Sequence, residues 1–327
     1  MVPNRDDPHP NRRYRGQRLA LIVPCYNEEA AIASVVRGFR AALPAVDVYV
    51  FDNASTDRTA EVARADGARV VRVALRGKGN VVRRMFADVD ADVYVMVDGD
   101  ATYDPKSVRP LIDKLLDEGL DMVVGCRRTP DELARAAYRR GHRFGNAMLT
   151  NGVRGIFGGS FEDMLSGYRV FSRRYVKSFP AVSRGFEIET ELTVHALELR
   201  MPYGELDTPY FARPEGSASK LSTWRDGLRI LRTIGGLYVM ERPLAFFGAG
   251  AVLMASAALA LFVPVLLQYM ESGLVPRLPT AVLSATMMVC ALLSLVCGLV
   301  LNTVTHGRQE VKRLAYLSVP ALRPEHQ

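Results

Sequence analysis

The sequence predicts an α/β domain built on a mostly parallel sheet with helices on both faces, followed by two membrane-spanning helices. Two observations predict this organisation. Residues 18 to about 215 alternate short apolar runs with segments of helical periodicity, which is typical of βαβ units. Residues 243–270 and 278–305 contain no Asp, Glu, Lys or Arg, and each run exceeds the roughly 20 apolar residues that cross a bilayer.

The elements of the first region follow one another in a regular order. Strands are expected at residues 18–24, 46–52, 68–74, 92–98, 121–127 and 166–174, with helices at 27–43, 55–67 and 79–90 between the earlier ones. Ser55 or Thr56 is expected to cap the second helix, and Gly67 to end it. Helices between consecutive strands predict parallel pairing.

Composition excludes some classes of protein. The chain has 42 Lys and Arg against 35 Asp and Glu, a net charge of only +7. Its basic residues gather beside the apolar runs rather than among exposed aromatic residues, so we expect no nucleic-acid partner. The four cysteines have no close metal-ligand spacing, which favours a reduced, cytosol-facing protein. Residues 1–17 are polar and basic, and we interpret them as a disordered tail.

Acidic residues follow three of the expected strands. The first strand ends in "PCYNEE", the second in "DNASTD" and the fourth in "DGDATYD". Ligands of open α/β sheets bind beyond the carboxyl ends of the strands, so these side chains should face one site. Oxygen ligands suit Mg²⁺ or Mn²⁺ carrying a diphosphate. The sequence therefore predicts that Asp98 and Asp100 hold a divalent cation.

Charged residues flanking the two apolar runs indicate their orientation. The connector offers Arg277, offset by Glu271, whereas several cations lie on the other side of both runs. These are Arg225, Arg229, Arg232, Arg242, Arg308, Lys312 and Arg313. Cations remain on the cytoplasmic side, so both termini are expected there. Residues 219–242 have apolar residues at helical spacing among cations, which favours an interfacial helix; an amphipathic helix packed on the α/β domain is the alternative.

Five motifs resemble one family. "LIVPCYNEE", "DNASTDRT", "RGKGN", "DGDATYDP" and "DMLSGYRVFSR" occur in the order found in family 2 glycosyltransferases of the Rossmann-like GT-A fold. With its two C-terminal spans, the chain looks like the polyprenyl-phosphate glycosyltransferases of that family. The resemblance implies an enzyme that transfers a sugar, with inversion, from a nucleotide-sugar donor to a polyprenyl phosphate. The reaction would need Mg²⁺ or Mn²⁺ and would occur at the cytoplasmic face of the inner membrane.

The resemblance also implies roles for individual residues. It assigns donor binding to Pro24, Tyr26, Glu28, Asp52, Lys78 and Asp98, and metal binding to Asp98 and Asp100. It assigns the acceptor phosphate to Arg127, Arg143, Arg169 and Lys220, and it counts Asp98, Asp100, Arg127 and Arg143 as catalytic. Two departures from the family pattern are Thr102, where some relatives have an amide, and Asn53, where the usual residue is acidic.

Other questions stay open at this point. A glycosyltransferase acting on a hydroxyl of a glycolipid or polysaccharide is one alternative, and a non-catalytic membrane scaffold is another. The resemblance leaves a homo-oligomer open. Glu187, Glu189 and Glu191 would share one face of a strand, whereas in a helix only Glu187 and Glu191 would. We expect a tail at 1–17, a catalytic domain at 18–218, juxtamembrane helices at 219–242, a hairpin at 243–305 and a cytoplasmic tail at 306–327.

Overall fold

The computed structural model describes residues 13–128, 152–155, 158–159, 161–183, 185, 187–214, 232, 235–236 and 238–322. These residues fall into two compact units. The first comprises residues 1–230 and 312–327, and the second comprises residues 231–311. The α/β domain belongs to the first unit and most of the two apolar helices to the second.

A seven-stranded sheet forms the centre of the α/β domain, in the order β3-β2-β1-β4-β6-β5-β7. Its strands are β1 Leu19–Cys25, β2 Asp47–Asp52, β3 Arg69–Arg72, β4 Val93–Met96, β5 Met122–Arg128, β6 Arg169–Ser172 and β7 Tyr203–Pro209. β6 pairs antiparallel with β4 and β5, and the other neighbouring strands pair in parallel. The mostly parallel sheet predicted from the sequence is therefore confirmed.

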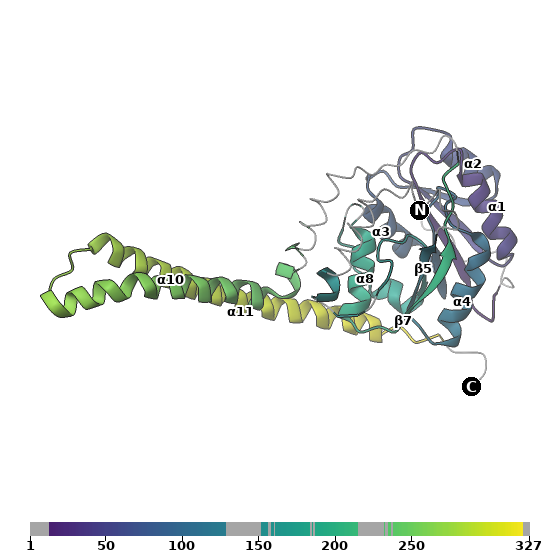
Figure 1. Ribbon diagram of the computed structural model, residues 1–327. Helices are drawn as coiled ribbons and strands as arrows, with labels where there is room; N and C mark the ends of the chain where they lie inside the picture. The colour runs from purple at the N-terminus through teal and green to yellow at the C-terminus, as the bar shows by residue number, and fades with distance from the viewer. Residues whose placement is uncertain are drawn as a thin grey trace. The chain divides into compact units, whose positions relative to one another are not determined.

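Helices cover both faces of this sheet (Figure 1). They are α1 Ile32–Ala42, α2 Thr59–Ala65, α3 Lys78–Asp88, α4 Val108–Asp117, α7 Arg173–Ser178 and α8 Ile188–Glu198, with a 3-10 turn, η1, at Pro105–Ser107. On one face α1 contacts α2 and α4, while on the other α3 contacts α7 and α8. Each long helix buries an apolar stripe, such as Ile32, Val35, Val36 and Phe39 in α1.

The ends of α2 test two expectations about helix capping. Ser55 and Thr56 do not cap the helix, because it begins later, at Thr59. Ser55 instead accepts a hydrogen bond from the main chain of Asn27, and Asp57 Oδ1 accepts one from Thr59 N over 3.0 Å. The capping prediction was wrong because the turn after β2 uses these side chains. Gly67 does follow the helix end, with φ 84°.

The second unit contains most of two long apolar helices, α10 Pro243–Ser272 and α11 Leu278–Leu317. The most apolar 18-residue stretches of the two helices have mean hydropathy 2.4 and 2.3. Both are long and apolar enough to cross a membrane. Small residues are buried at seven-residue intervals along each helix. They are Ala251 and Ala258 in α10, and Ser284, Ala291 and Gly298 in α11. Large residues such as Leu253 and Leu292 remain exposed. Small side chains let two helices approach closely when lipid covers the rest.

The C-terminal segment is more ordered than a tail. α11 continues to Leu317, past the expected end of the hairpin. Within the first unit, Lys312 Nζ lies 2.6 Å from Glu198 Oε2, and Tyr316 donates a 2.8 Å hydrogen bond to Asp121. The segment from residue 312 therefore packs on the catalytic domain. Of the expected juxtamembrane helices, residues 219–231 lie outside the described residues, and residues 238–241 are helical.

Candidate active site

A cavity of about 350 Å³ lies beyond the carboxyl ends of β1, β2 and β4. This is the edge of an open α/β sheet where ligands bind. Six residues predicted for donor or metal binding line the cavity: Pro24, Tyr26, Glu28, Lys78, Asp98 and Asp100. The parallel register explains this convergence, because Cys25 of β1 pairs with Asp52 of β2 and Ile22 with Met96 of β4.

Asp98 and Lys78 form an ion pair at the cavity. Lys78 Nζ lies 2.6 Å from Asp98 Oδ1 and 2.6 Å from Glu189 Oε1 of α8. Burial alone would lower the pKa of Lys78, but the charges and hydrogen bonds of the two carboxylates outweigh it and raise that pKa above its usual value. Lys78 is therefore a fixed ammonium group at the cavity wall.

Asp100 is held from two sides. Its Oδ1 accepts a 2.6 Å hydrogen bond from the Thr102 hydroxyl, and its Oδ2 lies 2.8 Å from Arg213 Nη2. Thr102 thus orients the carboxylate. Arg213 follows β7, and its segment is positioned by a hydrogen bond from Phe211 N to Thr102 O. Sequence reasoning missed Arg213, since it lies more than 100 residues from the acidic motif and carries no motif of its own.

The residues present fit a divalent cation. Asp98 and Asp100 offer hard carboxylate oxygens, which Mg²⁺ and Mn²⁺ prefer, and each already attracts one cationic side chain. Close packing requires glycine at two positions beside them: a Cβ on Gly167 would lie 2.3 Å from Asp98 Oδ2, and one on Gly99 would lie 2.4 Å from Cys25 Sγ. Gly167 therefore leaves the space that the Asp98 carboxylate occupies.

The other end of the cavity combines an aromatic ring with polar groups. The Arg76 guanidinium lies 4.8 Å from the centre of the Tyr26 ring, and its Nη1 donates a 2.8 Å hydrogen bond to the Tyr26 hydroxyl. Asn53 Oδ1 accepts a 2.7 Å hydrogen bond from Gly77 N, which fixes the turn before α3. A planar ring beside a guanidinium is a surface on which a nucleobase stacks.

Asp52 is placed differently from its neighbours. It is buried at the end of β2, and its Oδ1 accepts a 3.2 Å hydrogen bond from Ser55 N. It is not among the described residues that line the cavity, whereas Asn53 is. The sequence identified Asn53 only as a departure from the family pattern. The structure shows that Asn53 orders the loop carrying Arg76 and Lys78.

The arginines predicted for the acceptor phosphate occupy different environments. Arg127, at the end of β5, makes a bidentate ion pair with Asp163, with Nε and Nη2 2.7 and 2.8 Å from its two oxygens. Burial opposes the charge on Asp163, but the hydrogen bonds and charge of Arg127 outweigh that cost and lower its pKa. Asp163 belongs to a quoted motif, yet sequence reasoning assigned it no role. Arg143 and Lys220 lie outside the described residues.

Arg169 is enclosed in the core instead. It is fully buried in β6, and its guanidinium donates to the main-chain oxygens of Ser166, Met164 and Glu189. It also donates to Thr193 Oγ1 over 3.0 Å. A guanidinium enclosed in this way has no route to a lipid phosphate in this conformation. Arg169 ties the loop before β6 to the first turn of α8.

The three glutamates of "GFEIETEL" separate once α8 begins at Ile188. Glu189 points to Lys78, whereas Glu191 accepts hydrogen bonds from Val182 N and Ser183 N, both over 2.8 Å. Glu187 is the residue before the helix. The helical alternative therefore holds, and it is Glu189 that pairs with Lys78 of the cavity wall.

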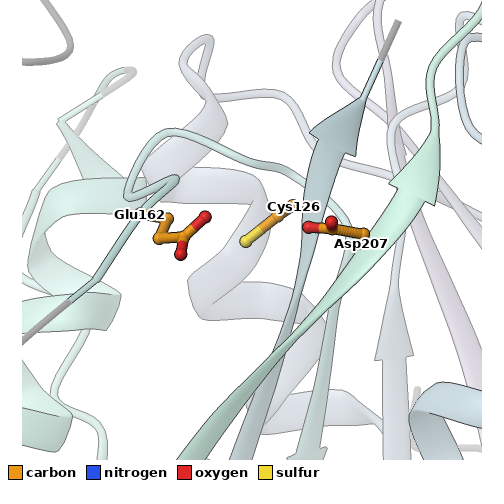
Figure 2. A group of neighbouring side chains, drawn as sticks. All are labelled: Cys126, Glu162 and Asp207. Atoms are coloured by element: carbon orange, nitrogen blue, oxygen red, sulfur yellow. The ribbon is translucent and has the colours of Figure 1, made fainter. Parts of the chain in front are cut away.

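A second acidic group lies elsewhere on the domain. Figure 2 shows Cys126 Sγ between the carboxylates of Glu162 and Asp207. The sulfur and one oxygen of each carboxylate lie within 4.8 Å of one another. Arg128 already pairs with both carboxylates, at 2.6 and 2.8 Å. Burial and the surrounding acids raise the pKa of the Cys126 thiol. A protonated thiol beside arginine-paired carboxylates is a poor metal site.

Comparison with known proteins agrees with this geometry. Residues 20–179 match the family model "Glycosyl transferase family 2". The chain is 35% identical over 232 residues to "Glycosyltransferase AglJ" of Haloferax volcanii, covering 71% of this chain and 75% of the relative. It is 28% identical over 229 residues to a "Dolichyl-phosphate hexose transferase" of the same organism, covering 70% and 97%.

A solved structure extends the comparison to three dimensions. Glucosyl-3-phosphoglycerate synthase from Mycobacterium tuberculosis, in complex with Mn²⁺, uridine diphosphate and glucosyl-3-phosphoglycerate, superposes with a TM-score of 0.56 at 26% identity. The match covers 68% of this chain and 80% of that one. The fold is thus that of the GT-A enzymes, and the chain belongs to glycosyl transferase family 2.

Proposed function

We propose that this glycosyltransferase transfers a sugar from a nucleotide-sugar donor to a polyprenyl phosphate at the cytoplasmic face of a membrane, with inversion at the anomeric carbon. The observation that carries the proposal is the pair Asp98 and Asp100, each held beside a cationic side chain at the cavity. Such an arrangement suits a ligand that brings both a divalent metal and a diphosphate.

The donor half of the cavity has groups for each part of a nucleotide sugar. Tyr26 and Arg76 offer a stacking surface for the base, and Glu28 offers an acceptor for base or ribose hydrogen-bond donors. Asp98 and Asp100 would hold Mg²⁺ or Mn²⁺, which would neutralise the departing nucleoside diphosphate. Lys78 and Arg213 would add positive charge on either side. The solved relative with Mn²⁺ and uridine diphosphate supports this assignment.

A phosphate acceptor would remove the need for a general base in the transfer step. A phosphate monoester is anionic at neutral pH, so its oxygen can attack without a general base. The new bond joins that oxygen to the anomeric carbon, and the old bond to the diphosphate breaks with its electron pair on the leaving group. Arg127, with Arg143 and Lys220, would hold the acceptor phosphate.

Two features support a lipid acceptor and the membrane location. α10 and α11 are long and apolar enough to span a membrane, and a polyprenyl tail cannot leave the bilayer. The relative named dolichyl-phosphate hexose transferase matches 70% of this chain. Cations flank both apolar runs on the side of the catalytic domain, which favours a cytoplasmic site.

The test uses the full chain purified in detergent. It is incubated with undecaprenyl phosphate, Mn²⁺ or Mg²⁺, and a panel of radiolabelled nucleotide sugars, and label moving into the organic phase is measured. Metal-dependent transfer from one donor, lost in Asp100→Asn, is the expected result. Arg127→Ala should slow transfer, whereas Arg128→Ala should not, because Arg128 pairs with exposed carboxylates outside the cavity.

The failing outcomes are distinct. Saturable binding of a nucleotide sugar without transfer to undecaprenyl phosphate would contradict the lipid acceptor and favour a hydroxyl acceptor. No binding of any nucleotide sugar would contradict the catalytic proposal as a whole and favour a scaffold.

A further inference from the structure

We propose that Glu189 is a positioning residue: it retains the ammonium group of Lys78 when a divalent cation takes Asp98. The inference rests on the proposed function, because it concerns the same metal and donor site. It assigns a role to an acidic residue whose part in the reaction the sequence left open.

The three charged groups form an asymmetric bridge. Lys78 Nζ lies 2.6 Å from Asp98 Oδ1 and 2.6 Å from Glu189 Oε1. The Asp98 side chain is 28% exposed and faces the cavity, whereas the Glu189 side chain is only 6% exposed. Asp98 can therefore exchange its partner for one that arrives through the cavity. Glu189 cannot, because it is closed off from it.

The second carboxylate oxygen of Glu189, Oε2, can accept a hydrogen bond from Lys78 once Lys78 leaves Asp98. Oε2 is buried and has no hydrogen-bond partner among the described residues. A buried carboxylate oxygen without a partner is costly, and buried polar atoms in folded proteins are nearly always satisfied. The nearby ammonium carries three donors. Once Lys78 leaves Asp98, it can turn a donor to Oε2 while it keeps Oε1.

The main chain of Glu189 is held by two hydrogen bonds, so Glu189 stays in place when the Lys78 side chain moves. The carbonyl oxygen of Glu189 accepts hydrogen bonds from Arg169 Nη2 over 3.2 Å and from Thr193 Oγ1 over 3.2 Å. Arg169 is itself fully buried and tied to the loop before β6. These hydrogen bonds hold the first turn of α8, and with it the Glu189 carboxylate, in place behind Lys78.

Electrostatics gives the exchange its direction. A divalent cation on Asp98 repels the ammonium, and an ammonium stripped of its partners in a buried position is expensive. Glu189 removes that cost by remaining as a counter-charge. Without its negative charge, Lys78 would have Asp98 as its sole charged partner among the contacts described here. A divalent cation that binds Asp98 would then have to break the Lys78–Asp98 ion pair and leave the buried ammonium without a carboxylate partner.

The test compares Glu189→Gln with Glu191→Gln, a matched change on the same helix. Glu191 accepts hydrogen bonds only from the main chain of Val182 and Ser183 in the described contacts. The readout is the Mn²⁺ affinity of the detergent-purified chain, from the signal of free Mn²⁺ in electron paramagnetic resonance, with and without uridine diphosphate. We expect Glu189→Gln to weaken Mn²⁺ binding at least tenfold, and Glu191→Gln to change it less than twofold.

A second pair of variants tests whether Glu189 acts through Lys78 and guards against misfolding. Lys78→Met removes the ammonium that competes for Asp98, and Lys78→Met/Glu189→Gln removes both buried charges, which is often tolerated when a whole pair is replaced. The two should bind Mn²⁺ equally. In transfer assays, Glu189→Gln should raise the Mn²⁺ concentration needed for half-maximal rate, while kcat at saturating Mn²⁺ stays within threefold.

Three results would overturn the inference without touching the proposed function. They are wild-type Mn²⁺ affinity in Glu189→Gln, a weakening that persists when Lys78 is already Met, or a loss of kcat that saturating Mn²⁺ does not restore. A wild-type chain that binds no Mn²⁺, even with uridine diphosphate, would instead contradict the proposed function.

Discussion

Arg213 Nη2 lies 2.8 Å from Oδ2 of Asp100, so a basic residue from beyond the last strand occupies one face of the predicted metal ligand. The contact depends on the chain after β7 running past Thr102, where Phe211 N donates to its carbonyl oxygen. Asp98 is paired in the same way with Lys78. Each carboxylate therefore has a cationic partner that a divalent cation would have to displace.

Replacing Arg213 should separate metal binding from catalysis. In Arg213→Ala the guanidinium no longer competes for Asp100, so Mn²⁺ alone should bind a few-fold more tightly. Transfer should nevertheless slow by about 10²-fold, as expected when one preorganised charge at a leaving group is lost. Mn²⁺ titration and initial transfer rates measure the two effects. Unchanged values for both would show that Arg213 is only a surface partner of Asp100.

Gly167→Ala should damage the site through Asp98. The new Cβ would lie 2.3 Å from Asp98 Oδ2, so the carboxylate must move, and a displacement of about 1 Å near the chemistry can cost about 10²-fold in rate. Gly155→Ala is the control, because no described residue lies within 4 Å of the position that its Cβ would take. Transfer rates of the two variants decide the matter, and equal rates would mean that Asp98 tolerates displacement.

His195 should make the catalytic domain sensitive to acid. Burial, with a contribution from the charge of Lys312, lowers the pKa of His195 to about 3, against about 6.5 in an unfolded chain. Between these values the unfolded chain binds a proton that the folded one does not, so stability falls as the pH falls from about 6.5. The loss should reach about 2 kcal/mol at pH 5.

The variant His195→Gln tests this cause. Its amide can still bond Ser178, whose hydroxyl lies 3.0 Å from His195 Nε2, but it does not titrate. The fall in Tm between pH 7 and pH 5 should be smaller in this variant than in the wild type. Parallel Tm curves for the two proteins would assign the acid sensitivity to other groups.

Gly298→Ile should loosen the pair of apolar helices. A Cβ at this position would lie 3.0 Å from Phe247 Cβ and 3.5 Å from the Leu244 main chain, so a branched side chain would overpack the contact, at a cost of about 1–3 kcal/mol. Gly307→Ile makes the same change in α11 at a position whose Cβ would have no neighbour within 4 Å in the described part of the chain. A lower Tm in detergent for the first variant alone is expected; equal Tm values would show that the contact is dispensable.

Local sequence accounts for much of the domain. Period-two and helical apolar patterns depend only on neighbouring residues, and they placed β1, α1, β2, α3 and β4 close to where they lie. Because ligands bind at the carboxyl ends of parallel strands, the sequence also predicted that Asp98 and Asp100 lie at the site, and both line the cavity. The predicted cap of α2 was wrong because Ser55 and Thr56 form hydrogen bonds with Asn27 of the preceding turn, and contacts across 28 or 29 residues leave no local pattern.

The sequence by itself determined the alternation of strands and helices, the acidic strand ends and two helices long enough to span a membrane. Only the tertiary structure decided which charges meet. Arg213 reaches Asp100 because β7 pairs with β5, and Glu189 reaches Lys78 because α8 packs against α3. Arg169 was predicted to bind the acceptor phosphate, but in the structure its guanidinium donates hydrogen bonds to main-chain carbonyl oxygens. The Arg213–Asp100 and Glu189–Lys78 pairs join residues more than 100 positions apart, and such contacts are set by packing rather than by local periodicity.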